Sequence, residues 1–267
     1  MTQSPIHPDG EITVEEQGNV LLLGLNRPEK INALTARMLR LLSEAYADYD
    51  RQEKYRCAVL YGHGRAFCGG ADLVNLKAAV ETDAMNFGDD EFDPFGLAGR
   101  RLSKPLVVAI HGGCFAGGLE LALNGDILVA AKGTKMGQPE VLRGLFAFAG
   151  GAIRWVERCA WGNAQRYLLT GDTIDAQEAW RIGLVQDLVD SDQALLHAVA
   201  LAQRIAGAAP LGVRNSLAVS RTALESGPLE AATLLSQMRR LLVATADAEE
   251  GVRSFLEKRP PGPFIGR

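Results

Sequence analysis

The chain has 267 residues, of which 47% are hydrophobic and 22% are charged, and its formal net charge is −4. This length suits one large domain, or one domain with an appendage, and it can bury a substantial core. The composition is that of an ordinary globular protein, and the acidic balance argues against a nucleic-acid-binding domain, which is usually basic.

The cysteines and histidines are scattered along the chain and lack the close spacing of a metal site, so we expect neither a zinc site nor metal catalysis. These residues are Cys57, Cys68, Cys114 and Cys159, and His7, His63, His111 and His197. Sparse, unpatterned cysteines are typical of a reducing compartment, so we expect a cytoplasmic protein.

The first ten residues carry neither a charged region nor an apolar run of the kind found in secretory signals, and they predict a short flexible tail over 1–10. No apolar stretch reaches transmembrane length, so we expect no membrane partner.

Three apolar segments in the first quarter of the chain predict strands. Residues 12–14 and 20–25 read as two strands joined by a turn at Gly18-Asn19, and residues 57–61 read as a short buried strand. Between them, Thr35 is expected to cap a helix that runs to about Tyr49, because apolar side chains recur at helical spacing.

Residues 74–98 are acidic and irregular, and they predict a loop that is either functional or a solvated insertion. The uninterrupted apolar run 105–110 predicts a strand covered on both faces, and 127–131 predicts another. A helix carrying Glu120 lies between these two strands, and strands that alternate with helices predict an α/β architecture.

The chain beyond about residue 150 is predicted to be almost entirely helical, with one strand-like segment at Leu184-Val185. Pro210 is expected to open a terminal helical region, and residues 259–263 hold too many prolines to remain helical.

Two glycine turns each follow a strand-like run. One is Gly69-Gly70-Ala71-Asp72, and the other is Gly117-Gly118-Leu119-Glu120 at the start of a helix. Glycine lets another group approach the backbone, and a helix start leaves N–H groups unpaired, so each turn could bind an anion. Each turn alone is equally compatible with a packing role.

A second glutamate lies in Gly137-Gln138-Pro139-Glu140, where Pro139 fixes the backbone next to the carboxylate. Two carboxylates beside one substrate can divide acid and base roles, because one can hold a proton while its neighbour is ionised. On its own, this motif is also compatible with a surface turn.

Read together and in order, these motifs resemble the crotonase superfamily, also called the enoyl-CoA hydratase/isomerase family. The resemblance runs through nearly the whole chain. The segments that carry it are 25–34, 66–73, 104–120, 137–140, 169–185 and 250–259.

The resemblance implies a spiral of ββα units over 11–200 that forms the acyl-CoA site, followed by a helical trimerisation region over 201–267. It implies an oxyanion hole built from the backbone N–H groups of Ala71 and Gly117. It also implies that Glu140 handles the proton at the α-carbon of the substrate and that Glu120 helps to activate water. Because both glutamates are present, hydration of an enoyl-CoA is favoured over isomerisation.

The family pattern further implies an acyl-CoA substrate with no separate cofactor, and assembly as a homotrimer or a dimer of trimers. Residues expected to contact CoA or the substrate are Arg27, Lys30, Ala33, Gly69, Gly70, Asp72, Leu73, Gly118, Phe255 and Lys258. The last two are expected to help from the terminal helix, and a neighbouring subunit could supply them.

The chain departs from the hydratase pattern at residues 145–154, where bulkier apolar groups replace a proline, one glycine and a Thr-Gln pair. This stretch would lie near the acyl pocket, so a simple short-chain substrate is in doubt, and isomerisation or another reaction on a bulkier acyl-CoA is the alternative. A non-catalytic module that binds CoA thioesters or RNA is the alternative from another class. RNA binding is disfavoured because the predicted helix near 35–50 mixes basic with acidic residues.

Overall fold

A computed structural model describes residues 6–72 and 86–267 of the chain. Leu73, residues 1–5 of the predicted tail and residues 74–85 of the predicted loop at 74–98 lie outside the described residues. From residue 86 to residue 98 the chain forms no helix or strand, apart from a single bridge that joins Phe92 to Gly99.

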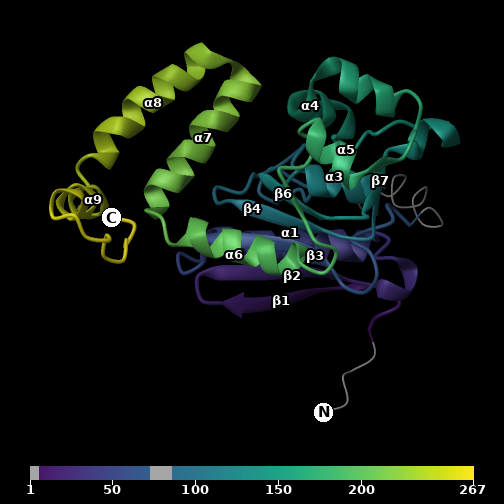
Figure 1. Ribbon diagram of the computed structural model, residues 1–267, viewed down its shortest axis with the longest axis horizontal. Coiled ribbons are helices and arrows are strands. Elements are labelled where there is room, and N and C mark those ends of the chain that lie inside the picture. The colour runs from purple at the N-terminus through teal and green to yellow at the C-terminus, as the bar shows by residue number, and fades with distance from the viewer. Residues whose placement is uncertain (1–5, 73–85) are drawn as a thin grey trace.

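A six-stranded sheet forms the centre of the molecule (Figure 1). Its strands, in spatial order, are β1 (Glu11–Gln17), β2 (Val20–Asn26), β3 (Cys57–Gly62), β4 (Leu106–Ile110), β6 (Ile127–Ala131) and β9 (Asp187–Val189). The β1–β2 hairpin is antiparallel, and the remaining pairs are parallel. The predicted strands at 12–14, 20–25, 57–61, 105–110 and 127–131 are therefore confirmed.

Alternate residues of these strands enter two separate apolar cores. In β3, Ala58 and Leu60 face one core, whereas Cys57 and Val59 face the other. Helix α1 (Ala36–Arg51) packs in the first core, and helix α6 (Ala194–Ala206) covers the second with small alanine side chains. Coverage on both faces explains why the central strands are continuous apolar runs rather than alternating ones.

Helix α1 begins where the sequence predicts, because the Thr35 side chain accepts a hydrogen bond from the Met38 N–H and so caps the first turn. A second, three-stranded sheet lies beside the first. It consists of β5 (Gly113–Phe115), β7 (Lys135–Gly137) and β8 (Ile174–Asp175). These short strands flank the two glutamate motifs and hold them near each other.

The prediction of a strand at Leu184-Val185 is wrong. Both side chains are buried, but the residues lie in a turn that follows Gly183, whose φ is +85°, and the strand β9 begins at Asp187. Burial alone made the two residues resemble a strand, because an apolar pair carries no information about backbone hydrogen bonding.

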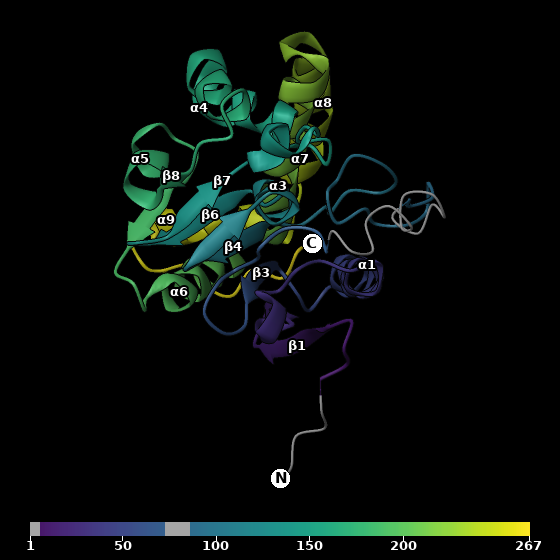
Figure 2. The same cartoon turned by 90° about the vertical axis from the view of Figure 1, so that its right-hand side faces the viewer.

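The remaining helices follow the sheets. They are α3 (Gly117–Leu123), α4 (Gly151–Leu168), α5 (Ala176–Arg181), α7 (Pro210–Ser226), α8 (Pro228–Leu242) and α9 (Ala246–Leu256). Helices α7 and α8 form a hairpin that projects away from the sheets, and α9 lies near the C-terminus at one end of the molecule (Figures 1 and 2). The predicted α/β class and the helical C-terminal region are confirmed.

Candidate active site

The two glycine turns lie side by side. The Cys68 N–H donates to the Gly113 carbonyl at 3.1 Å, and the Phe115 N–H donates to the Cys68 carbonyl at 3.0 Å. Gly70 has φ +111°, and a Cβ atom at this position would come within 3.0 Å of the Ala116 Cβ. Only glycine fits at Gly70, because the backbone is in a region that disfavours side chains and the neighbouring turn occupies the space.

The backbone N–H groups of Ala71 and Gly117 lie close together. An ideal Cβ on Gly117 would be 3.6 Å from the Ala71 nitrogen. Within the described residues neither N–H donates a backbone hydrogen bond, although the neighbouring Asp72 N–H donates to Leu34. Ala116, which directly precedes Gly117, has φ 50° and ψ −132°, an uncommon conformation for a residue with a side chain. Two unpaired donors that converge can stabilise one oxyanion.

Glu120 is buried on the first turn of α3, and its side chain is held by another part of the chain. Its residue is 3% exposed, and its Oε1 atom accepts a hydrogen bond from the Gly151 N–H at 2.9 Å. Burial raises the pKa of Glu120 to about 7, and the charge of Glu140 adds to this rise. The carboxyl group can therefore exchange a proton near neutral pH.

Glu140 lies on a short 3-10 helix, Pro139–Arg143, that directly follows β7. The residue is half-buried, and this burial raises the pKa of its carboxyl group. The amide orientation of Gln138 that satisfies its neighbours donates to the two Glu140 oxygens at 3.0 and 3.3 Å and to the Ala116 carbonyl at 3.2 Å. Gln138 thereby joins the second carboxylate to the strained turn beside the oxyanion site.

Gly151, the first residue of α4, brings the two glutamates into one site. A Cβ atom at this position would lie 3.0 Å from the Glu120 Cγ and 2.7 Å from the side chain of Gln138. Glu120 and the residue that orients Glu140 therefore contact the same glycine. A pair of proton-exchanging carboxyl groups beside two neighbouring N–H donors suits chemistry through an enolate.

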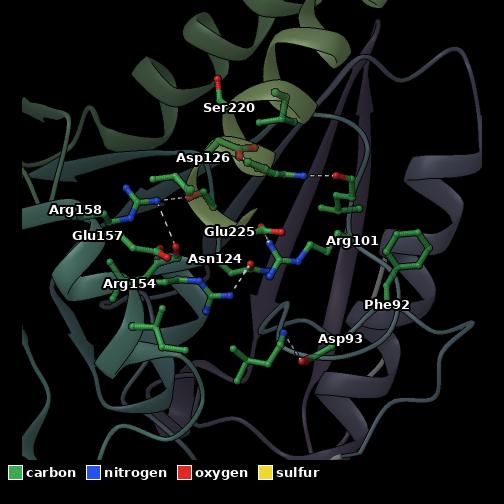
Figure 3. Close-up of a pocket in the computed structure, with 18 of the residues that line it drawn as sticks. Phe92, Asp93, Arg101, Asn124, Asp126, Arg154, Glu157, Arg158, Ser220 and Glu225 are labelled. Carbon is green, nitrogen blue, oxygen red and sulfur yellow. Dashed lines mark hydrogen bonds and ion pairs between the residues drawn. The ribbon is translucent and has the colours of Figure 1, made fainter. Parts of the chain in front are cut away.

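A cavity of about 380 Å³ lies between α7 on one side and α3, α4 and residues 92–102 on the other, and neither glutamate lines it (Figure 3). Arg154 of α4 lines it, and this side chain donates to the Phe95 carbonyl and to the Asn124 Oδ1. Burial lowers the pKa of Arg154 to about 10, and its positive charge acts to lower the pKa of Glu120. Arg154 therefore links the cavity that it lines to the electrostatics of Glu120.

We call residues 25–34 the entry segment. Some of its predicted CoA-contacting residues hydrogen-bond to one another or to the first glycine turn. The Arg27 Nη1 donates to the Asp72 carboxylate at 2.8 Å and to the Ala33 carbonyl at 3.2 Å. The Gly69 N–H donates to the Ile31 carbonyl at 2.8 Å, and Lys30 is exposed. These contacts fix the entry segment against the first glycine turn and leave Lys30 at the surface.

Phe255 and Lys258 lie elsewhere. Phe255 belongs to α9 and Lys258 follows it, and both are exposed. Figure 1 shows α9 at the opposite end of the long axis of the molecule from β7, which precedes Glu140. The structure of one chain therefore does not bring these two residues to the glutamates.

Four residues matter to the site although no sequence motif assigned them a role of their own: Asn32, Gln138, Gly151 and Arg154. Asn32 is fully buried and donates to the carbonyls of Ala66 and Phe67, which tie the entry segment to the first turn. Gln138 could have been noticed because it directly precedes Pro139 and Glu140. No local signal identifies Gly151 or Arg154.

In the described parts of the chain, no group of three histidine, cysteine, aspartate or glutamate side chains could hold a metal ion. No single helix there is long and apolar enough to cross a membrane; α6 and α7 pass that test only as a pair, with a bend of 107° between them.

The chain resembles known proteins over nearly all of its length. A family model described as "Enoyl-CoA hydratase/isomerase" matches residues 15–264. Enoyl-CoA hydratase EchA19 of Mycobacterium tuberculosis is 37% identical over 253 residues, which are 93% of this chain and 94% of that protein. The 2,3-dehydroadipyl-CoA hydratase of Escherichia coli is 34% identical over 96% of this chain and 99% of its own length.

A solved structure of a probable enoyl-CoA hydratase/isomerase from Mycobacterium abscessus matches with a TM-score of 0.91 and 41% identity, over 96% of this chain and 98% of that one. The chain belongs to the enoyl-CoA hydratase/isomerase family, and the predicted crotonase-like fold is confirmed.

Proposed function

We propose that the protein is an enoyl-CoA hydratase, a lyase that adds water reversibly to a 2-enoyl-CoA and gives a 3-hydroxyacyl-CoA. The observation that carries this proposal is the pair of glutamates linked through Gly151 and Gln138, beside the N–H groups of Ala71 and Gly117, which donate no backbone hydrogen bond within the described residues. Relatives named as hydratases of enoyl-CoA, 2,3-dehydroadipyl-CoA and crotonyl-CoA support it.

The thioester oxygen would accept hydrogen bonds from the Ala71 and Gly117 N–H groups. These bonds strengthen as negative charge moves onto the oxygen, and each such donor contributes about 2.7–4 kcal/mol to transition-state stabilisation in enzymes of this general type. The ionised Glu120 takes a proton from water while the oxygen of that water bonds to the β-carbon. The protonated Glu140 then delivers its proton to the α-carbon, and the enolate collapses to the product.

Isomerisation of the double bond is the second candidate. It moves a proton between carbons and needs only one carboxyl group that can accept and return it, so the buried and hydrogen-bonded Glu120 would have no role. The altered stretch at 145–154 is the observation that keeps this candidate open.

The experiment that decides between them follows the absorbance of the conjugated thioester for a panel of enoyl-CoAs, with products identified by mass spectrometry. A hydratase consumes 2-enoyl-CoA and gives a product heavier by one water. An isomerase converts the 3-enoyl isomer to the 2-enoyl form without a change in mass, and that result alone would overturn the hydratase proposal.

For binding partners, we propose that acyl-CoA is held partly by the entry segment, with Lys30 exposed beside it, and that Phe255 and Lys258 act on a neighbouring subunit of a trimer or a dimer of trimers. Lys258 can meet a phosphate as a point charge. The affinity ratio of CoA to 3′-dephospho-CoA should fall in Lys258→Ala, and an unchanged ratio would exclude Lys258.

We further propose that the reaction uses no separate cofactor and takes place in the cytoplasm. The four cysteines are buried as free thiols, which suits a reducing compartment. Activity of the purified, dialysed protein on enoyl-CoA alone tests the first point, and fractionation of cells tests the second.

A further inference from the structure

The wall of the cavity beside α7 is rich in arginine. Its volume of about 380 Å³ lies in the range of small-molecule sites, which is about 300–1,000 Å³. Charged side chains from residues 92–102, from α4 and from α7 line it, and positive charge is in excess. The arginines are Arg100, Arg101, Arg154, Arg158 and Arg221, and the carboxylates belong to Asp93, Asp126, Glu157 and Glu225.

Four of these arginines already have partners. Arg221 donates to the Asp126 carboxylate at 2.8 Å, and Arg101 forms an ion pair with Glu225 of α7. The other two, Arg100 and Arg158, contact the Asp50 carboxylate and the carbonyls of Leu123 and Gly125, respectively.

Arg154 is the exception. Its residue is only 9% exposed, and its guanidinium donates to the Phe95 carbonyl and to the Asn124 Oδ1. Among the described residues it forms no ion pair with a carboxylate. A buried cation that lacks such a partner is unfavourable, so the wall has a place for a negative charge.

A second guanidinium faces Arg154. Figure 3 shows Arg101 and Arg154 approaching each other from opposite walls, with Asn124 between them. Burial lowers the pKa of Arg154, and the charges of Arg101 and Arg158 lower it further, whereas Glu157 and Asp93 act in the opposite sense. An anion between the two guanidinium groups would offset their repulsion and give Arg154 an ion-pair partner.

Two hydrogen-bond donors in the wall have no partner among the described residues. They are the Nη1 group of Arg154 and the hydroxyl of Tyr46, and both residues line the cavity. Burial raises the pKa of Tyr46, so its hydroxyl keeps its proton. Because both atoms are buried, a ligand reaches them only after a small shift of these side chains. A carboxylate or phosphate group supplies the acceptors that such donors require.

We propose that this cavity binds a small molecule through a carboxylate or phosphate group held between Arg101 and Arg154, and that the bound anion regulates the base Glu120. Neither glutamate lines the cavity, so the anion is a separate ligand rather than part of the substrate. The binding site stands on the wall alone, and its regulatory effect rests on the proposed function.

The effect on Glu120 has a definite sign. Burial raises the pKa of Glu120, and the Gly151 N–H, the charge of Glu140, the backbone of Ala149 and the charge of Arg154 modify it. Of these, the charge of Arg154 acts to lower the pKa. An anion beside Arg154 offsets that charge, so the pKa of Glu120 rises and less of the base is ionised at neutral pH.

Isothermal titration calorimetry of the full-length protein with citrate, and separately with inorganic phosphate, tests the site. Sodium chloride keeps the ionic strength constant, and saturating CoA keeps the probe out of any CoA site. The wild type should bind at least one of the two anions at a single saturable site. Arg154→Met and Arg101→Met should each weaken this binding roughly tenfold or more, because each removes one of the two facing guanidinium groups.

Arg166→Met is the matched control. It removes an equal charge from the same helix, but Arg166 is exposed, pairs with Asp172 and does not line the cavity. Its affinity for the probe should equal that of the wild type. If Arg154→Met does not fold, as judged by circular dichroism, Arg101→Met decides the test, because the side chain of Arg101 is 48% exposed.

The second measurement follows turnover of crotonyl-CoA with and without the anion that binds. The rise of kcat/KM with pH should move upward by about half a pKa unit, which lowers the rate about threefold below the pKa of Glu120. Folded Arg154→Met should not respond to the anion. Inhibition that competes with crotonyl-CoA and persists in Arg154→Met would overturn the regulatory role, because the anion would then act at the substrate site.

No saturable binding of either probe, or wild-type affinity in the folded Arg154→Met and Arg101→Met variants, overturns the binding site. Binding without a shift of the pH profile overturns the link to Glu120. If the anion binds as expected but no enoyl-CoA is hydrated, the hydratase proposal fails and the binding site stands.

Discussion

The site around Glu120 and the C-terminal hairpin of α7 and α8 differ in how many of their residues a single chain buries. Every residue of α3 from Gly118 to Leu123 is buried, and the Glu120 carboxylate has a backbone partner. Helix α7, by contrast, has no buried residue and α8 only Ala231, and both helices lie wholly within the described part of the chain.

Large apolar side chains of the hairpin and of α9 are turned to solvent, among them Leu229, Leu241 and Phe255. A single chain therefore buries Glu120 and its helix but leaves an apolar surface on its C-terminal helices. Such a surface normally marks an interaction site. The difference indicates that contacts within one chain hold the site, whereas the apolar surface of the hairpin needs contacts with another molecule to be buried.

The largest expected effect comes from removing the C-terminal helices, whose apolar side chains are exposed. Deleting residues from about 210 onward should give insoluble or monomeric, inactive protein, because the deletion removes the proposed subunit interface. Light scattering and enoyl-CoA turnover measure the outcome. A milder change, Leu241→Asp, should weaken self-association while leaving circular dichroism unaltered. A full-length active monomer at working concentration would contradict the proposed assembly.

The next largest effect tests the site that holds Glu120 and Glu140. Glu120→Gln and Glu140→Gln should each lower kcat by roughly 10²–10⁴-fold, because the amide keeps the shape of the side chain but cannot exchange a proton. Binding of acyl-CoA, measured by calorimetry, should be largely retained. The double variant should cost much less than the product of the two single effects, since the residues act as a unit. Near-normal turnover in either single variant would refute the two-carboxylate mechanism.

A smaller effect concerns the free energy of unfolding and its dependence on pH. The pKa of Glu120 is about 7 in the folded protein against an ordinary value of 4.5, so the folded state binds this proton more tightly than the unfolded state. Its contribution to stability is present below pH 4.5 and is lost as the pH rises through 7, a difference on the order of 3 kcal/mol.

Glu120→Gln removes this loss. The variant should therefore be more stable than the wild type at pH 8 and similar to it near pH 4.5, as measured by urea unfolding. Equal stability of the two proteins at pH 8 would contradict this prediction, because it would mean that ionisation of Glu120 does not lower the free energy of unfolding.

The smallest expected effect is a shift in the pH profile of activity. The charge of Arg154 acts to lower the pKa of Glu120, so Arg154→Met should raise that pKa. The rise of kcat/KM with pH, which follows ionisation of the base, should then move to higher pH. Arg154→Lys keeps the charge and should move it less. A uniform loss of activity without a shift would assign Arg154 a purely structural role.

Much of the fold follows from local patterns in the sequence. The apolar runs at 20–25 and 105–110 predict strands that the structure contains, and Thr35 predicts the start of α1. These features depend on side-chain periodicity and on hydrogen bonds between residues a few positions apart, so neighbouring residues suffice to specify them. The family match could likewise be made from ordered motifs alone.

The sequence by itself thus determined the α/β class, the family and the two glutamates as candidates. Only the tertiary structure decided how these parts meet. It pairs Arg27 with Asp72, joins Glu120 to the Gly151 N–H, and places Leu184 and Val185 in a buried turn rather than a strand. It also places α9 far from the site of its own chain (Figure 1). The reason is physical: periodicity and turn chemistry act over a few residues, whereas contacts between distant segments depend on how the whole core packs.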